Sequence, residues 1–199
     1  MSLKIALQEF AKTFNNTVGN FGSVRFIYTS EIQYPSTLPA GILLNYYKFL
    51  QIERGAMIGN AFLMDLVSVD ELMTSLLGWR WKKTNTIIGD ESEENSKWKK
   101  SWVIIGSRNG DVVFVDTDFS QGSIFGCLPA GAPFVISESL ASFYQCLTEC
   151  MKIERDIFNY ETFDEDFNRL KLFLKRVRII ACQHLGEEGT MGFMKFFFE

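Results

Sequence analysis

The sequence predicts an α+β fold in which a central mixed, mainly antiparallel sheet is flanked by helices and followed by a C-terminal helical extension. Three observations lead to this prediction. Trp102–Ile105 and Val112–Val115 are apolar runs of strand length, and Asn109-Gly110 between them accepts the positive φ angles of a tight hairpin turn. The apolar positions of residues 140–151 recur at helical spacing. A chain of 199 residues with 47% hydrophobic content can bury one sizeable core, so we expect a single domain over residues 1–199.

The N-terminal half contributes both helices and strands. Residues 3–14 carry their apolar side chains on one helical stripe, and Pro39 suits the first position of a second helix. Ser68 and Glu71 form a capping box, which starts a short third helix at about Val69. Strands are expected over residues 24–28 and 62–67.

The middle of the chain completes the sheet. Ile124-Phe125 is a third short strand that follows the hairpin. Pro129, Gly131 and Pro133 then interrupt regular structure until Ser137, whose hydroxyl is placed to cap the next helix.

The C-terminal region predicts one long helix and an apolar tail. Thr162 and Glu165 form a second capping box, and the apolar side chains after it repeat at helical steps. The tail, residues 193–199, contains four Phe and one Met. It packs into the core as an edge strand, or it is an exposed contact for a dimer partner or another protein.

The order of motifs between residues 102 and 147 resembles the SMI1/KNR4 (SUKH) family. The resemblance rests on a Trp, a strand that ends in Ile-Gly, and three further motifs: Ser-x-x-Gly-Asp at 107–111, Gly-x-Ile-aromatic-Gly at 122–126, and Ser-x-Ser-x-x-x-Phe at 137–143. Leu38-Pro39 and the strand and short helix of residues 62–72 are compatible with the first half of the family's domain.

The resemblance is strongest over residues 30–150. It departs from the family at Arg54-Gly55, where an Asn-Gly turn is common, and residues 152–199 are an unplaced helical extension. Membership would imply an α+β domain that binds other proteins without catalysis. Such domains are most often bacterial immunity proteins that neutralise a toxin by masking its active site, and similar fungal domains serve as regulatory interaction modules.

The segment of residues 82–100 has high charge density and little apolar content, which is typical of a long surface loop. One interpretation is a solvated loop. The other is a partner-docking loop, in which negative charge meets a basic toxin surface and tryptophans act as anchors. The candidate partner-binding residues are Trp81, Asp90, Glu91, Glu93, Glu94 and Trp98.

Composition and motifs argue against several other classes of protein. A net charge of −4 disfavours direct binding of nucleic acid, and no apolar run has the ~20 residues needed to span a membrane. Without a secretion signal, we expect a cytoplasmic protein that is a monomer or a weak homodimer. His184 is the only histidine and has no nucleophile paired with it in the sequence, so we expect no enzyme.

No cofactor or metal is expected. The four cysteines lack a paired ligand motif, although Cys146 and Cys150 would share one helix face. Asp111, Asp116 and Asp118 lie close together in the sequence, but aspartate is also common in turns for backbone reasons. A regulatory scaffold and a small-molecule-binding protein remain the alternatives to an immunity protein, and the latter would need a deep pocket.

Overall fold

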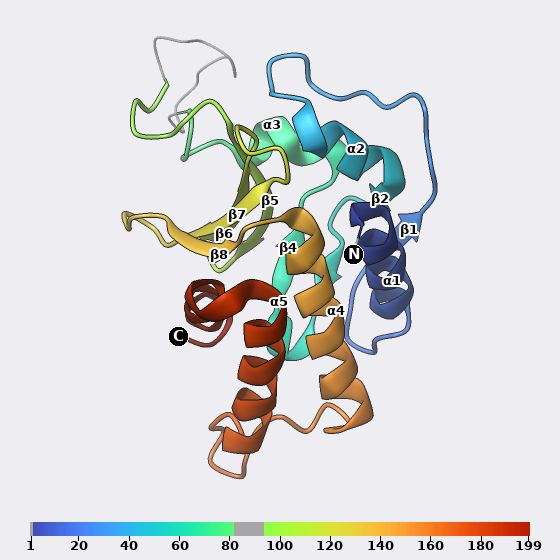
Figure 1. Cartoon of the computed structure of the whole chain (residues 1–199), viewed down its shortest axis with the longest axis vertical. Helices are drawn as coiled ribbons and strands as arrows, with labels where there is room; N and C mark the ends of the chain where they lie inside the picture. Colours follow the sequence, from blue (N-terminus) through green and yellow to red (C-terminus); the bar gives the residue numbers. More distant parts are fainter. Residues whose placement is uncertain (1, 82–93) are drawn as a thin grey trace.

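The computed structural model describes residues 2–81 and 94–199 and confirms the predicted α+β fold (Figure 1). The main sheet has six strands in the order β3-β4-β5-β6-β7-β8, and a smaller sheet pairs β1 with β2. Every pair of neighbouring strands is antiparallel, so the described sheets contain no parallel strand pair of the kind a mixed sheet would have. The strands are β1 Val24–Phe26, β2 Leu50–Ile52, β3 Met57–Ile58, β4 Met64–Leu66, β5 Trp102–Arg108, β6 Asp111–Asp116, β7 Ser123–Cys127 and β8 Phe134–Ser137.

The β5–β6 hairpin forms as the sequence predicts. Asn109 and Gly110 both have positive φ angles, 51° and 94°, and they join strands paired from Arg108↔Asp111 outward. Asparagine and glycine tolerate this conformation at little steric cost, so the turn fixes the register of the hairpin.

Helices cover one face of the sheet (Figure 1). Leu140 of α4 and Val115 of β6 lie together beside Gly122, which places Val115 on the helical side. Because side chains alternate along a strand, Phe114 points to the opposite face, where Trp98 and Trp102 pack against its ring. The helices are α1 Leu3–Asn15, α2 Gly41–Phe49, α3 Leu72–Ser75, α4 Leu140–Asp156 and α5 Lys171–Phe198, with short 3-10 turns η1 Asn60–Phe62 and η2 Val69–Glu71.

Two predicted helix starts are wrong. The cap of α4 is Ser139, which accepts a hydrogen bond from the backbone of Ser142, while Ser137 ends the unpredicted strand β8. The prolines at 129 and 133 rule out regular structure only as far as residue 133, and the Phe-Val-Ile run after them has strand character. By contrast, the capping box of Ser68 and Glu71 is confirmed at the start of η2.

The second wrong start is that of the C-terminal helix. Its predicted cap, Thr162, instead accepts a hydrogen bond from Arg169 at 2.9 Å, and α5 begins only at Lys171. The Asp164 side chain accepts hydrogen bonds from the backbone of Asp166 and Asn168, so it stabilises a turn in place of a helix.

The Phe-rich tail packs into the core, but as a helix and not as an edge strand. Gly186 has φ 71° and ψ −175°, so α5 changes direction there and its last turns are seen nearly end-on in Figure 1. These turns contact the edge strand β8, and Phe193, Phe196 and Phe197 are at most 1% exposed. A helix thereby covers a sheet edge that would otherwise offer unpaired backbone groups to another chain.

Candidate functional site

The structure describes three of the six predicted partner-binding residues, namely Trp81, Glu94 and Trp98. Asp90, Glu91 and Glu93 lie outside the described residues. Trp81 and Trp98 are buried, with exposed fractions of 2% and 7%. Trp81 therefore offers almost no surface to a partner, and Trp98 offers only a small part of its ring, so their role as anchors stays a prediction.

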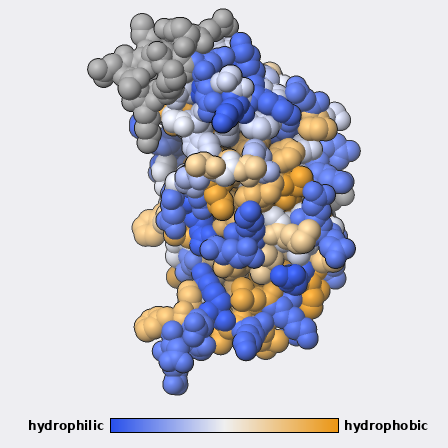
Figure 2. Space-filling model, turned by 90° about the vertical axis from the view of Figure 1, so that its left-hand side faces the viewer, coloured by the Kyte–Doolittle hydropathy of each residue, from blue (hydrophilic) through white to orange (hydrophobic). Residues whose placement is uncertain are grey.

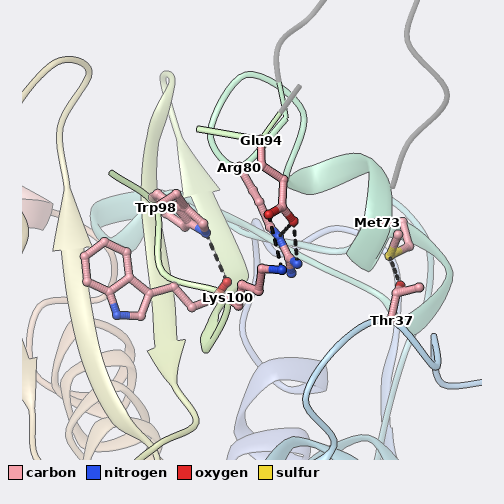
Figure 3. A network of polar contacts seen from close by, with 7 residues as sticks. Thr37, Met73, Arg80, Glu94, Trp98 and Lys100 are labelled. Atoms are coloured by element: carbon pink, nitrogen blue, oxygen red, sulfur yellow. Dashed lines mark hydrogen bonds and ion pairs between the residues drawn. The ribbon is translucent and has the colours of Figure 1, made fainter. Parts of the chain in front are cut away.

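Glu94 is part of a network of charged groups (Figure 3). Its Oε1 atom accepts hydrogen bonds from Nε and Nη2 of Arg80 at 3.0 and 2.8 Å, and Oε2 lies 3.6 Å from Nζ of Lys100. Burial raises the pKa of the Glu94 carboxyl, but the hydrogen bond and charge of Arg80 outweigh it, so this pKa is below its usual value. Arg80 itself is buried and lies over the Trp81 ring. Glu94 therefore has partners within the fold.

The described residues on either side of positions 82–93 are joined at this network. Trp81 and Glu94 form an isolated antiparallel bridge. The backbone of Asn95 donates to the carbonyl of Arg80 at 2.7 Å, and its side chain donates to the carbonyl of Trp79 at 3.0 Å. Residues 80–81 and 94–95 therefore lie side by side.

An open groove lies beside that point, on the face of the sheet opposite the helices. Its volume is about 800 Å³. We call it the aromatic groove, because Trp79, Trp98 and Trp102 line it together, with neighbouring ring centroids 5.4 and 5.3 Å apart. Its other described lining residues are Leu77, Gly78, Asn95, Lys97, Cys127 and the 129–133 turn between β7 and β8.

The indole groups of the groove are held in place by their own hydrogen bonds. Trp98 donates from Nε1 to the carbonyl of Trp102 at 3.1 Å, and Trp102 donates to Oδ2 of Asp116 at 2.9 Å. Asp116 is 1% exposed and also lies 3.7 Å from the ammonium of Lys99. The Trp98 and Trp102 rings are therefore fixed by hydrogen bonds that satisfy their indole NH groups.

The groove contains one thiol. Burial, together with the charge of Asp111, raises the pKa of Cys127, so the thiol stays protonated at neutral pH and is a poor nucleophile. Its Sγ atom lies 3.5 Å from the carbonyl oxygen of Gly131. The described wall of the groove therefore offers mainly the rings of its own tryptophans for contact.

The ionisable groups with strongly shifted pKa values lie elsewhere, in the core. The hydroxyl groups of Tyr46 and Tyr144 are 2.5 Å apart, and burial raises both pKa values. Burial raises the pKa of Glu154 to about 7, although a hydrogen bond from the Ala61 backbone and the charge of Arg169 favour its ionised form. These groups join helices to each other and to η1, so we assign them to the fold.

The remaining cysteines and the histidine discussed in the sequence analysis lie apart from the aromatic groove. Cys146 and Cys150 are both buried on α4, and His184 of α5 lines a small pocket together with residues of α1 and α4. Across residues 2–81 and 94–199, no three His, Cys, Asp or Glu side chains gather into a possible metal site. The same residues include no helix with the length and apolarity needed to cross a bilayer.

The structure therefore shows an α+β domain with an open groove lined by aromatic rings. The chain matches no family model, no curated protein and no solved structure. Of the three groove tryptophans, sequence reasoning singled out only Trp98. It missed the groove, since it treated Trp102 only as a strand residue and the 129–133 turn only as a connection. The available signal was the occurrence of all four tryptophans of the chain within residues 79–102.

Proposed function

We propose that this chain is a non-catalytic protein-binding domain of the SMI1/KNR4 type. In this proposal it acts in the cytoplasm as an immunity protein and neutralises a toxin by masking the toxin's active site. The order of β5, β6, β7 and α4 supports the proposal, because the resemblance to that family rests on the same order of motifs. The strand β8, which lies between β7 and α4 in the chain, is not among the motifs on which the resemblance rests.

The observation that carries the proposal is the aromatic groove, which is lined by Asn95, the residue that follows the acidic segment of residues 90–94 in the chain. The cores of protein interfaces are enriched in aromatic residues, and their strongest contacts fill preformed pockets. Asp90, Glu91 and Glu93 directly precede Glu94 and Asn95 in the chain, and Asn95 lines the groove. Negative charge next to an apolar pocket suits a basic partner, whose association it would accelerate.

A small-molecule-binding protein is the second candidate, and the groove volume favours it. Ligand pockets have volumes of about 300–1,000 Å³ and are lined mainly by apolar and aromatic side chains. The groove has about 800 Å³ and three tryptophans. Its open form and the few ionisable groups in its described wall favour a protein partner over a small polar substrate.

The first experiment is a pull-down of the tagged protein from its native host, with mass spectrometry of the bound proteins. Recovery of one toxin domain in near-equal amounts, whose activity the purified protein then inhibits, would support the proposal. Several weakly bound host proteins would instead indicate a regulatory interaction module or scaffold. The absence of a bound protein would favour the small-molecule candidate.

Variants of the acidic segment then test the mechanism on the recovered toxin. We expect neutralisation of Asp90, Glu91 and Glu93 to slow association about tenfold and to reduce its salt dependence, because these charges act by steering. Glu94 must stay unchanged, since its removal would leave the buried Arg80 unpaired and confuse loss of binding with loss of stability. Unchanged association rates would remove the segment from the binding mechanism.

A further inference from the structure

A second surface, remote from the aromatic groove, exposes aromatic side chains among acids. After α4, residues 157–170 form a loop at the bottom of Figure 1. Three large apolar side chains on it are exposed: Ile157 at 57%, Phe163 at 49% and Phe167 at 86%. Figure 2 shows apolar side chains that project from hydrophilic surroundings at the lower end of the molecule. Isolated exposed apolar residues are ordinary, but several large ones on a short loop mark an interaction site.

The part of this loop that carries Phe167 is a closed hairpin, which we call the 162–170 hairpin. The backbone of Leu170 donates to the carbonyl of Thr162, and that of Asp164 donates to the carbonyl of Asn168, both at 2.9 Å. The Phe167 backbone donates to the carbonyl of Asp164 at 3.1 Å. The hairpin tip is therefore defined by its own hydrogen bonds before any partner binds.

Arg169 fixes the hairpin to the core. Its guanidinium donates to Thr162 Oγ1 at 2.9 Å, lies 3.9 Å from the centroid of the Phe163 ring, and approaches the carbonyl of Ala61 at 3.5 Å. The backbone NH of Ala61 in turn donates to the buried carboxylate of Glu154 at 2.8 Å. A preordered loop loses less conformational entropy on binding, so its exposed ring can contribute more to affinity.

The charge of the loop indicates the chemistry of the partner. Residues 157–170 contain four acids and one base. The acids, Glu161, Asp164, Glu165 and Asp166, are all exposed, whereas the base, Arg169, is half-buried against the core. Such a surface repels the anionic headgroups of a cytoplasmic membrane and attracts a basic protein.

We propose that the 162–170 hairpin is a docking site for a basic protein surface, which receives the Phe167 ring in an apolar pocket rimmed by Lys or Arg side chains. The acids at 165 and 166 face those cations and steer the encounter, and Phe167 is the anchor. This proposal goes beyond the toxin-binding role and does not depend on it, because the hairpin and the aromatic groove share no residues.

The test is selection of binders from a random peptide display library on the whole protein, followed by affinity measurements on variants. Phe167→Asn removes the ring and keeps a residue that tolerates the φ of 60° at this position. Phe119→Asn is the matched control, because Phe119 is 52% exposed in another loop. Glu165→Gln with Asp166→Asn removes the charge but leaves Asp164, which holds the turn.

We expect the selected peptides to combine Lys or Arg with bulky apolar residues. They should bind Phe167→Asn at least about tenfold more weakly, which is the loss typical of a hot-spot residue, and bind the Phe119 control as tightly as the native protein. The charge variant should bind more slowly and with less salt dependence. Several outcomes would overturn the proposal: no enriched peptide, binding unaffected by Phe167→Asn, or binding lost in Trp79→Ala. Concentration-dependent dimerisation that Phe167→Asn abolishes would also overturn it, because a second copy would then cover the surface.

Discussion

Gly192→Ala is expected to destabilise the fold, because the last turns of α5 lie directly on the backbone of the edge strand β8. A Cβ atom at residue 192 would lie 1.8 Å from the carbonyl oxygen of Val135. One at Gly189 would lie 2.5 Å from the carbonyl oxygen of Ile136. Cβ atoms essentially never come within 3.0 Å of another heavy atom, so the helix and the strand must separate.

The expected loss in the free energy of unfolding follows from the side chains that this separation would disturb. Phe193, Phe196 and Phe197 are packed in the same turns, and each is at most 1% exposed. Overpacking costs about 1–3 kcal/mol, and each fully buried ring contributes about 1.5–3 kcal/mol that a shifted helix loses in part. Alanine recovers about 1 kcal/mol because it favours the helix more than glycine does. We expect a net loss of about 3 kcal/mol in the free energy of unfolding, which lowers Tm by about 6–12 °C in a domain of this size.

The assay is thermal and urea unfolding of the native protein and three variants. Gly186→Ala is a comparison variant: a Cβ there would meet no atom within 4 Å, but φ 71° with ψ −175° is a conformation that almost only glycine adopts. We therefore expect a loss of about 1–3 kcal/mol from backbone strain alone. Met191→Ala is the control, because Met191 is 59% exposed in the same turns and should change little. A Gly192→Ala protein as stable as the native one, or more stable, would refute the close packing of α5 on β8.

Three further substitutions test buried polar groups. Burial raises the pKa of Glu154 from 4.5 to about 7, so the folded protein retains a proton that the unfolded chain releases. This contribution to stability is complete below pH 4.5 and is lost as the pH rises to about 7. Glu154→Gln should flatten that part of the pH dependence of unfolding, and an unchanged slope would contradict the assignment. Glu94→Ala should cost about 3 kcal/mol in urea unfolding, because it leaves the Arg80 guanidinium buried and unpaired; a neutral effect would mean that water reaches Arg80. Tyr46→Phe should cost about 1–3 kcal/mol by leaving the Tyr144 hydroxyl without a partner. In a double-mutant cycle with Tyr144→Phe, purely additive effects would show that the two hydroxyls do not interact.

The parts of the fold that the sequence predicts correctly are those that local chemistry determines. Asn109-Gly110 forms the expected turn because both residues accept positive φ, and no distant contact is needed for it. The Thr162 and Glu165 pattern fails for the opposite reason. Its cap hydroxyl is bound by Arg169, and that arginine is held by the carbonyl of Ala61, which is far away in the chain. A capping motif thus predicts a helix only where no tertiary partner competes for its side chains.

The candidate site was only partly predictable. Trp79, Trp98 and Trp102 are visible as residue types in the sequence, but their contact depends on how the segment before β5 folds back over the sheet. Trp98 also satisfies its indole NH internally, through the carbonyl of Trp102, which periodicity and charge patterns do not reveal. Charge density draws attention to the part of the chain that precedes the groove residue Asn95, whereas the buried state of Trp81 follows from tertiary packing alone.

The two candidate surfaces differ in how far binding can be separated from stability. Trp98 packs on Phe114 and is 7% exposed, so its replacement removes core packing as well as a groove wall. Phe167 is 86% exposed and contributes almost no burial, while the hydrogen bonds that hold its hairpin come from backbone groups and from Asp164 and Arg169. A loss of binding at Trp98 therefore needs a stability measurement before it can be interpreted. A loss of binding at Phe167 with unchanged Tm would be direct support for a recognition role, because the fold gains little from keeping that ring in water.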